Sequence, residues 1–124
     1  MDIRNILNKD VLGIIFDYVS HMILLEWIDI KKLNWGQLSF NPNAIHLLEK
    51  NLEKIDWVCL SYNLNAIHLL EKNPEKINWY YLSSNPNAIH LLEKNPEKID
   101  WERLSSNQNI FKFMDKKYII ENYL

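Results

Sequence analysis

Three histidines invite attention as metal ligands, because His46, His68 and His90 recur at intervals of 22 residues. Each is followed three residues later by a glutamate, as Glu49 follows His46, and imidazole and carboxylate are both zinc donors. Stacked helices would hold successive histidines about 10 Å apart, whereas the ligands of one zinc ion lie about 2 Å from it. Two ligands on one helix without a third make a poor site. We therefore expect a solvated polar ladder, with no metal and no cofactor.

Nucleophilic catalysis has equally little support. Cys59 is the single cysteine, which excludes an intramolecular disulfide and suits a reducing compartment. No pattern of partner residues marks it as a nucleophile. The chain has only two glycines, Gly13 and Gly36, and so no glycine-rich phosphate loop. Glutamates alternate with lysines, which is typical of a neutral solvated surface. The sequence predicts that the protein is not an enzyme.

Composition also narrows the class of partner. The chain has 124 residues and a net charge of −2, so it has no global field to attract nucleic acid or an anionic membrane. Its most apolar stretch, residues 11–28, is interrupted by Asp17, His21 and Glu26 and reads as a core segment, not a membrane span. The first residues lack the layout of a signal peptide. We expect an intracellular protein that binds neither nucleic acid nor membrane.

The elements that must position these residues follow from one repeated unit. Tryptophan recurs every 22 residues, at Trp35, Trp57, Trp79 and Trp101, each opening a near-copy of W-x-x-L-S-x-N-P-N-A-I-H-L-L-E-K-N-P-E-K-I-D. The units are 35–56, 57–78, 79–100 and, more loosely, 101–122. A period of this length indicates stacked units, none of which can bury its apolar face alone. The sequence therefore predicts an all-α fold, a short α-solenoid.

Each unit is predicted to hold two helices. In the third unit, Asn85 and Pro86 are a cap and a first-turn proline that start a helix running to Lys94. Asn95 is expected to end that helix in the left-handed conformation. A second, single-turn helix, α or 3₁₀, covers residues 101–104.

Helical spacing predicts which side chains form the core. Ala88, Ile89 and Leu92 share one face of the longer helix, and Trp79 and Leu82 share one face of the short helix. Because the same residue types recur in the other units, we expect one continuous core.

Both ends depart from the repeat. Residues 1–34 are expected to form an N-terminal helical cap, with a helix at 10–19 and a degenerate half-unit at 22–34. The fourth unit is expected to merge into a C-terminal cap at 107–124, built on a bulkier helix. Caps of this kind shield the last core faces of a solenoid.

The motif W-x-x-L-S-x-N-P-N-A-I-x-L-L-E, with its entry at 25–29 and its close at 109–111, resembles a short repeat of giant nucleocytoplasmic DNA viruses, mimivirus relatives especially. The resemblance covers roughly residues 22–122, with Leu52, Leu64 and Gln108 in place of prolines. It implies an intracellular viral protein, in the host cytoplasm, and implies little about activity. The architecture also resembles leucine-rich-repeat-variant solenoids, in which α and 3₁₀ helices alternate.

Segment 7–19 resembles the first half of an F-box, whose pattern is L-P-x-E-[LI]-L-x-x-I-F-x-x-L. Asn8 stands where the proline is expected, and the second half of the motif is missing. This resemblance implies that Leu12, Ile15 and Phe16 contact a Skp1-like protein. A capping helix would show the same apolar spacing, so a plain cap stays the alternative.

The positions that vary between near-identical units, the second, third and sixth, are the candidate binding residues. They lie on or just after the short helix, away from its tryptophan and leucine. The candidates are Gln37, Phe40, Val58, Cys59, Tyr62, Tyr80, Tyr81 and Arg103. Aromatic side chains on a rigid surface are good anchors for a protein partner. We expect a protein-interaction module. The alternatives are an F-box-like adaptor of a Skp1–cullin ubiquitin ligase and a structural virion component that assembles end to end or laterally.

Overall fold

The computed structural model describes residues 22–124. The expected helix at 10–19 and the F-box-like contacts Leu12, Ile15 and Phe16 lie outside the described residues. Within residues 22–124 the secondary structure consists of α-helices and 3₁₀ turns, without a strand. No helix in this part of the chain has both the length and the apolar character needed to cross a membrane.

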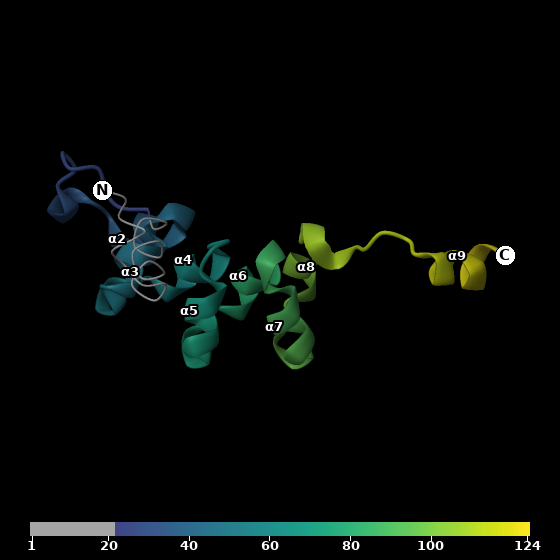
Figure 1. Ribbon diagram of the computed structural model, residues 1–124. Helices are drawn as coiled ribbons and strands as arrows, with labels where there is room; N and C mark the ends of the chain where they lie inside the picture. Colours follow the sequence, from purple (N-terminus) through teal and green to yellow (C-terminus); the bar gives the residue numbers. More distant parts are fainter. Residues whose placement is uncertain (1–21) are drawn as a thin grey trace, which may run out of the picture.

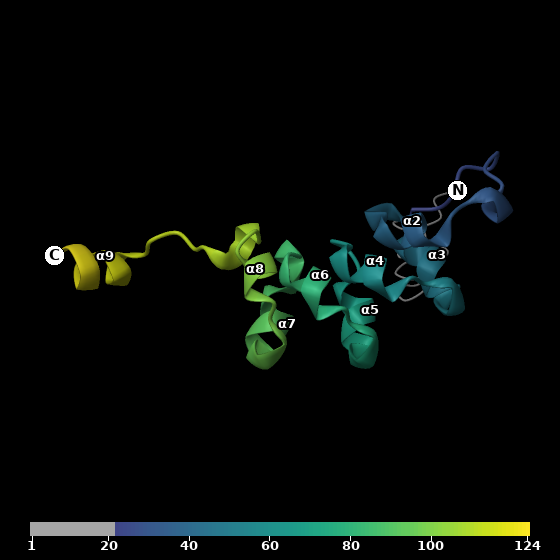
Figure 2. The same ribbon diagram turned by 180° about the vertical axis from the view of Figure 1, so that it is seen from behind.

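The repeated units stack into a short all-α solenoid, as the sequence predicts (Figure 1). The first helices are α2 (Trp35–Phe40), α4 (Trp57–Tyr62), α6 (Trp79–Ser83) and α8 (Trp101–Leu104). The second helices are α3 (Ile45–Glu49), α5 (Ile67–Lys72) and α7 (Ile89–Lys94). Each first helix packs on the first helix of the next unit, α2 on α4, α4 on α6 and α6 on α8. Seen from the front and from behind, α5 and α7 hang below the row formed by α4, α6 and α8 (Figures 1 and 2).

Short 3₁₀ turns connect these helices. The turns Pro42–Ala44, Pro86–Ala88 and Gln108–Ile110 follow a first helix, and Leu52–Lys54, Pro74–Lys76 and Pro96–Lys98 follow a second helix. The helix expected from Pro86 to Lys94 thus begins with a 3₁₀ turn, and the later turns were not expected. In the second unit, residues 64–65 form a plain turn, where Leu64 replaces proline.

Side chains end as well as begin these helices. Asp100 caps α8 by accepting from the backbone N–H of Arg103 at 2.9 Å. The expected left-handed end at Asn95 is wrong, because its φ is −133° and no described residue other than glycine has a positive φ. Its Nδ2 instead donates to the carbonyl of Leu91 at 2.8 Å. The amide satisfies one of the carbonyls left open at a helix end, so no left-handed residue is needed.

The core is one column of leucine, alanine and isoleucine shared by all units. Leu60 and Leu82 are fully buried, as are Ala66 and Ala88. Trp35, Trp57 and Trp79 lie at the rim of this core and are only half-buried. In three units a lysine ammonium lies 4.7–4.9 Å from the tryptophan ring centroid, in the pairs Lys54–Trp35, Lys76–Trp57 and Lys98–Trp79. The tryptophan therefore seals the edge of a unit with a cation above it.

A column of buried asparagines runs beside this apolar core. Asn85 donates through Nδ2 to the carbonyls of Ser61 and Asn63, both at 3.1 Å, in the preceding unit. Its Oδ1 accepts from the backbone N–H of Asn87 at 3.0 Å. Asn63 and Asn107 make the same three bonds one unit before and one unit after. The asparagine that starts a helix in its own unit also ties that unit to its neighbour.

Serine forms a second column of polar contacts. Ser61 is fully buried; its hydroxyl donates to the carbonyl of Trp57 at 2.8 Å and accepts from the backbone N–H of Asn78 at 2.9 Å. Ser39 and Ser83 repeat both bonds in their own units. The hydroxyl thus connects the end of one first helix to the residue that caps the next.

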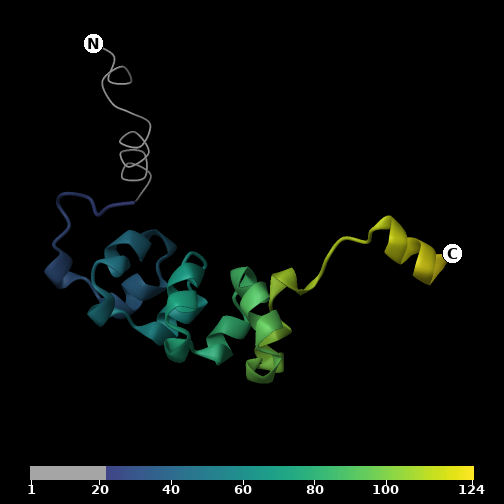
Figure 3. The same cartoon turned by 60° about the horizontal axis from the view of Figure 1, so that its bottom comes forward.

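The C-terminal end differs from the expected cap. The fourth unit follows the repeat only to Ile110, residues 111–115 have no regular structure, and α9 (Lys116–Tyr123) lies beyond the stack (Figure 3). All residues from Gln108 to Leu124 are exposed, and Trp101 is 65% exposed. Ile110 occupies the position of the fully buried Ala66 and Ala88 but is itself 39% exposed. Residues 107–124 therefore leave the last core face open.

We predict that the buried asparagines contribute more to stability than their caps alone. Asn85→Ala removes the side-chain donor from the carbonyls of Ser61 and Asn63, of which Asn63 keeps the backbone N–H of Ala66 at 3.2 Å. Together with the lost cap, this should lower the free energy of unfolding by about 3 kcal/mol. Asn41→Ala is the matched control, because the exposed Asn41 makes the same cap to Asn43 and should cost about 1 kcal/mol. Urea unfolding of both variants measures the difference. Equal losses would contradict a role for the bonds between units.

Candidate functional site

A groove crosses all four units on the side of the first helices. Its volume is about 330 Å³, and each unit contributes the residues at its sixth and eighth positions. The lining residues are Phe40, Pro42, Tyr62, Leu64, Ser84, Pro86, Ser106 and Gln108. The seventh residue of each unit is an asparagine and lies between each pair. In the last three units it belongs to the buried column and fixes the groove wall from beneath, whereas Asn41 of the first unit is exposed.

The end of the groove nearest the N-terminus is aromatic. Phe40 and Tyr62 stack with ring centroids 5.2 Å apart and ring planes within 5° of parallel. Both rings stay accessible, because Phe40 is 48% exposed and Tyr62 is 36% exposed. The stack arises from the repeat itself, since the two residues occupy the same position in adjacent units. It presents a flat apolar surface whose two rings support each other.

A cation lies at the other side of this aromatic surface. The guanidinium carbon of Arg103 is 4.7 Å from the ring centroid of Tyr80 and 5.7 Å from that of Tyr81. The two tyrosines meet edge to face, with centroids 5.1 Å apart. Arg103 also donates through Nη2 to the hydroxyl of Ser84, at a long 3.4 Å. Its head group is thus held over aromatic rings without a carboxylate partner among the described residues.

The structure brings together five of the eight predicted binding residues. Phe40, Tyr62, Tyr81 and Arg103 line one hollow of about 240 Å³, and Tyr80 joins it through Arg103. The other three predicted residues, Gln37, Val58 and Cys59, line neither the groove nor this hollow.

Sequence reasoning missed the eighth-position residues Pro42, Leu64, Pro86 and Gln108, because it assigned them only to helix starts. Two of the four are not proline, and that variation was the available signal.

Cys59 is half-buried on α4. Burial raises the pKa of its thiol, and the charge of Asp56 and a hydrogen bond with Asp56 raise it further. A raised pKa leaves less thiolate at neutral pH, and thiolate is the reactive form. The environment of Cys59 is the opposite of one that activates a nucleophile.

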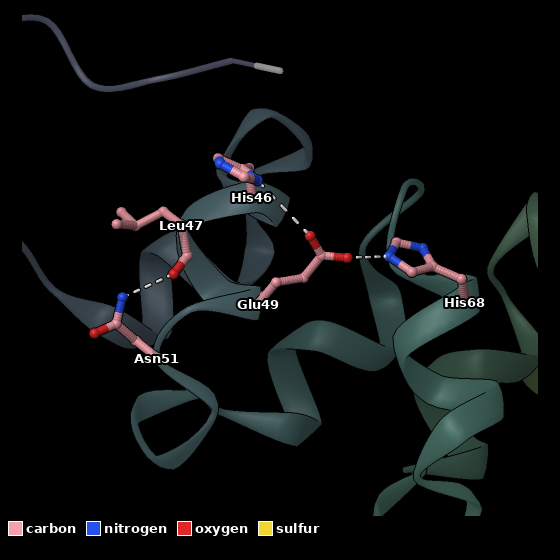
Figure 4. Close-up of polar contacts among 5 residues, drawn as sticks. All are labelled: His46, Leu47, Glu49, Asn51 and His68. Atoms are coloured by element: carbon pink, nitrogen blue, oxygen red, sulfur yellow. Dashed lines mark hydrogen bonds and ion pairs between the residues drawn. The ribbon is translucent and has the colours of Figure 1, made fainter. Parts of the chain in front are cut away.

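The histidines form bonds between units that the helical spacing alone did not predict. His68 Nε2 lies 2.7 Å from Glu49 Oε1, and His90 Nε2 lies 2.7 Å from Glu71 Oε1. Figure 4 shows Glu49 between His68 and His46, whose Nδ1 is 3.9 Å from the second carboxylate oxygen. Each link joins a second helix to its successor on the solvated side. Among residues 22–124, no group of three or more His, Cys, Asp or Glu side chains is arranged to hold a metal ion.

Comparisons with family models, curated proteins and solved structures found no match to this chain.

We predict that Cys59 reacts slowly. Its alkylation by iodoacetamide at neutral pH should be slower than that of free cysteine, and the pH at which the rate is half-maximal should be higher. Asp56→Asn removes the carboxylate but keeps an acceptor that can cap α4, so it should speed the reaction. A thiol that reacts at the rate of free cysteine or faster would contradict the burial assigned to it.

Proposed function

We propose that the protein is a non-catalytic interaction module that binds a protein partner along the groove of its first helices. One observation carries the proposal: the sixth and eighth positions, which vary between near-identical units, line one continuous groove across all four units. The leucine and serine at the fourth and fifth positions of each unit already close the core beneath the groove. Covering the core therefore does not require the variable residues that line it. A neutral charge balance favours a protein over nucleic acid as partner.

The chemistry of the groove narrows the partner. The Phe40–Tyr62 stack suits a flat or branched apolar side chain, and such aromatic surfaces supply most of the energy at interfaces. Arg103 offers a cation beside it, which suits a carboxylate at the adjacent position of the partner. Beyond Tyr62, the serines Ser84 and Ser106 add little bulk, and their hydroxyl groups donate to the backbone carbonyls of Tyr81 and Arg103. The groove therefore fits an extended segment that carries an apolar anchor and a nearby acidic residue.

The resemblance to repeats of giant DNA viruses supports an intracellular setting in an infected cell for this interaction. The F-box-like alternative depends on Leu12, Ile15 and Phe16, which lie outside the described residues. A partner that needs these three residues instead of the groove would favour the Skp1-like adaptor. The proposed binding along the groove rests on described residues alone and does not require the Skp1-like adaptor.

Removing the aromatic anchors should abolish partner binding. In the variant with Phe40, Tyr62 and Tyr81 all changed to Ser, partners captured from infected-cell extract by the native protein should be lost, as read by quantitative mass spectrometry. Removal of Tyr118 and Tyr123 on α9 is the control, because these exposed aromatics lie outside the groove. Circular dichroism melts of both variants should stay near that of the native protein. A groove variant that still captures every partner would refute the proposal.

A further inference from the structure

The two ends of the described stack are unfinished in complementary ways. Residues 101–110 match the first half of a unit and then leave the stack. Residues 22–29 form no helix, but the 3₁₀ turn Ile30–Lys32 lies 22 residues before the equivalent turn Leu52–Lys54, so residues 30–34 repeat the close of a unit. The α8 end lacks this closing turn, and the other end carries it. The inner junctions show which contacts such halves make when they meet.

The α8 end presents acceptors without donors. At the preceding junction, Ser83 Oγ accepts from the backbone N–H of Asp100 at 3.0 Å, and Ser83 O accepts from Asn107 Nδ2 at the same distance. The equivalent atoms of the last unit belong to Ser105, and the equivalent of the Asn85 carbonyl belongs to Asn107. No described side chain donates to these carbonyls, and no described backbone N–H donates to the Ser105 hydroxyl. This end offers the acceptor half of a junction.

The first unit presents the matching donors. Asn63 and Asn65 donate through Nδ2 to the preceding unit, Asn63 twice at 2.9 and 3.0 Å and Asn65 at 3.0 Å. Their equivalents in the first unit are Asn41 and Asn43, whose Nδ2 groups have no acceptor among residues 22–124. The backbone N–H of Asn34, equivalent to that of Asp56, has none either.

The two partners of the lysine–tryptophan contact are also separated between the two ends of the stack. In each complete unit, the lysine at position 20 lies over the tryptophan at position 1. Trp101 is 65% exposed and has no lysine over it in the described structure. Lys32 occupies position 20 of the N-terminal half-unit and lies over no ring of residues 22–124. The asparagine, serine and lysine contacts are thus all split between the two ends in one register.

We propose that a second copy of this chain occupies the open α8 end, head to tail. Residues 101–110 of one copy and 30–34 of the next then form one junction of the stack, with Asn41 donating to the open carbonyls and Lys32 covering Trp101. Because the two contact surfaces differ, the contact does not close on itself and further copies add in a row. The groove would continue across each junction, from Ser106 of one copy to Phe40 of the next. This assembly goes beyond the proposed function and does not depend on the groove's partner.

Two end variants and their mixture test the assembly by sedimentation velocity. The native protein should form species of increasing mass as its concentration rises. Asn41→Asp keeps the oxygen that caps Asn43 but places a carboxylate against two carbonyls, so it should weaken association at least about tenfold. Trp101→Glu should block the other end. The two variants mixed should form a one-to-one dimer and nothing larger, because each supplies the end that the other lacks.

Because these residues are exposed, we expect the variants to fold. Thermal unfolding at low protein concentration should therefore be close to that of the native protein. Lys32→Glu, an exposed change, serves as a second block of the donor end if Asn41→Asp alters the melt. A native protein that remains monomeric up to about 1 mM would overturn the proposal. Asn41→Asp and Lys32→Glu variants that associate as strongly as the native protein, or a mixture that forms no dimer, would also overturn it.

Discussion

The buried asparagine column is the interaction on which the rest of the structure depends. Helices of four to six residues have little stability of their own in water. A unit becomes stable only when a neighbour accepts its asparagine Nδ2 and covers its leucines. Because Asn63, Asn85 and Asn107 each satisfy a turn in one unit and two carbonyls in another, a misplaced unit would leave buried polar groups unpaired. The column therefore sets the register as well as the strength of the stack.

The positions that hold the stack together are different from those that line the groove. The leucines and alanines at invariant positions face the interior, and the invariant asparagines and serines bond between units, whereas the second, third, sixth and eighth positions change. Variation at the sixth position produces the Phe40–Tyr62 stack directly, because stacking brings equivalent residues of adjacent units together. The same geometry places Arg103 over Tyr80 and Tyr81. Because the register is fixed, residues 22 positions apart in the sequence become neighbours on one continuous surface.

Local signals in the sequence predicted the local structure well. The tryptophan period, the Asn-Pro starts and the single-turn helix at 101–104 follow from capping and spacing alone, and the all-α solenoid is confirmed. The asparagine column could not be predicted in this way, because donor and acceptor lie 22 or 24 residues apart and meet only in the stack. How far each tryptophan side chain is buried could not be predicted either, because it also depends on how the units stack. The expected C-terminal cap is not seen, because residues 108–124 are exposed and the chain leaves the stack after Ile110.

Hydrogen exchange of the asparagine side-chain amides tests the central claim most directly. In nuclear magnetic resonance spectra of a dilute sample, the Nδ2 protons of Asn63, Asn85 and Asn107 should exchange slowly with solvent, because each is buried and bonded to the neighbouring unit. The equivalent protons of Asn41, which has the same cap but no preceding carbonyls among the described residues, should exchange fast. Similar rates at all four residues would contradict the account, because the column would then not hold the units together.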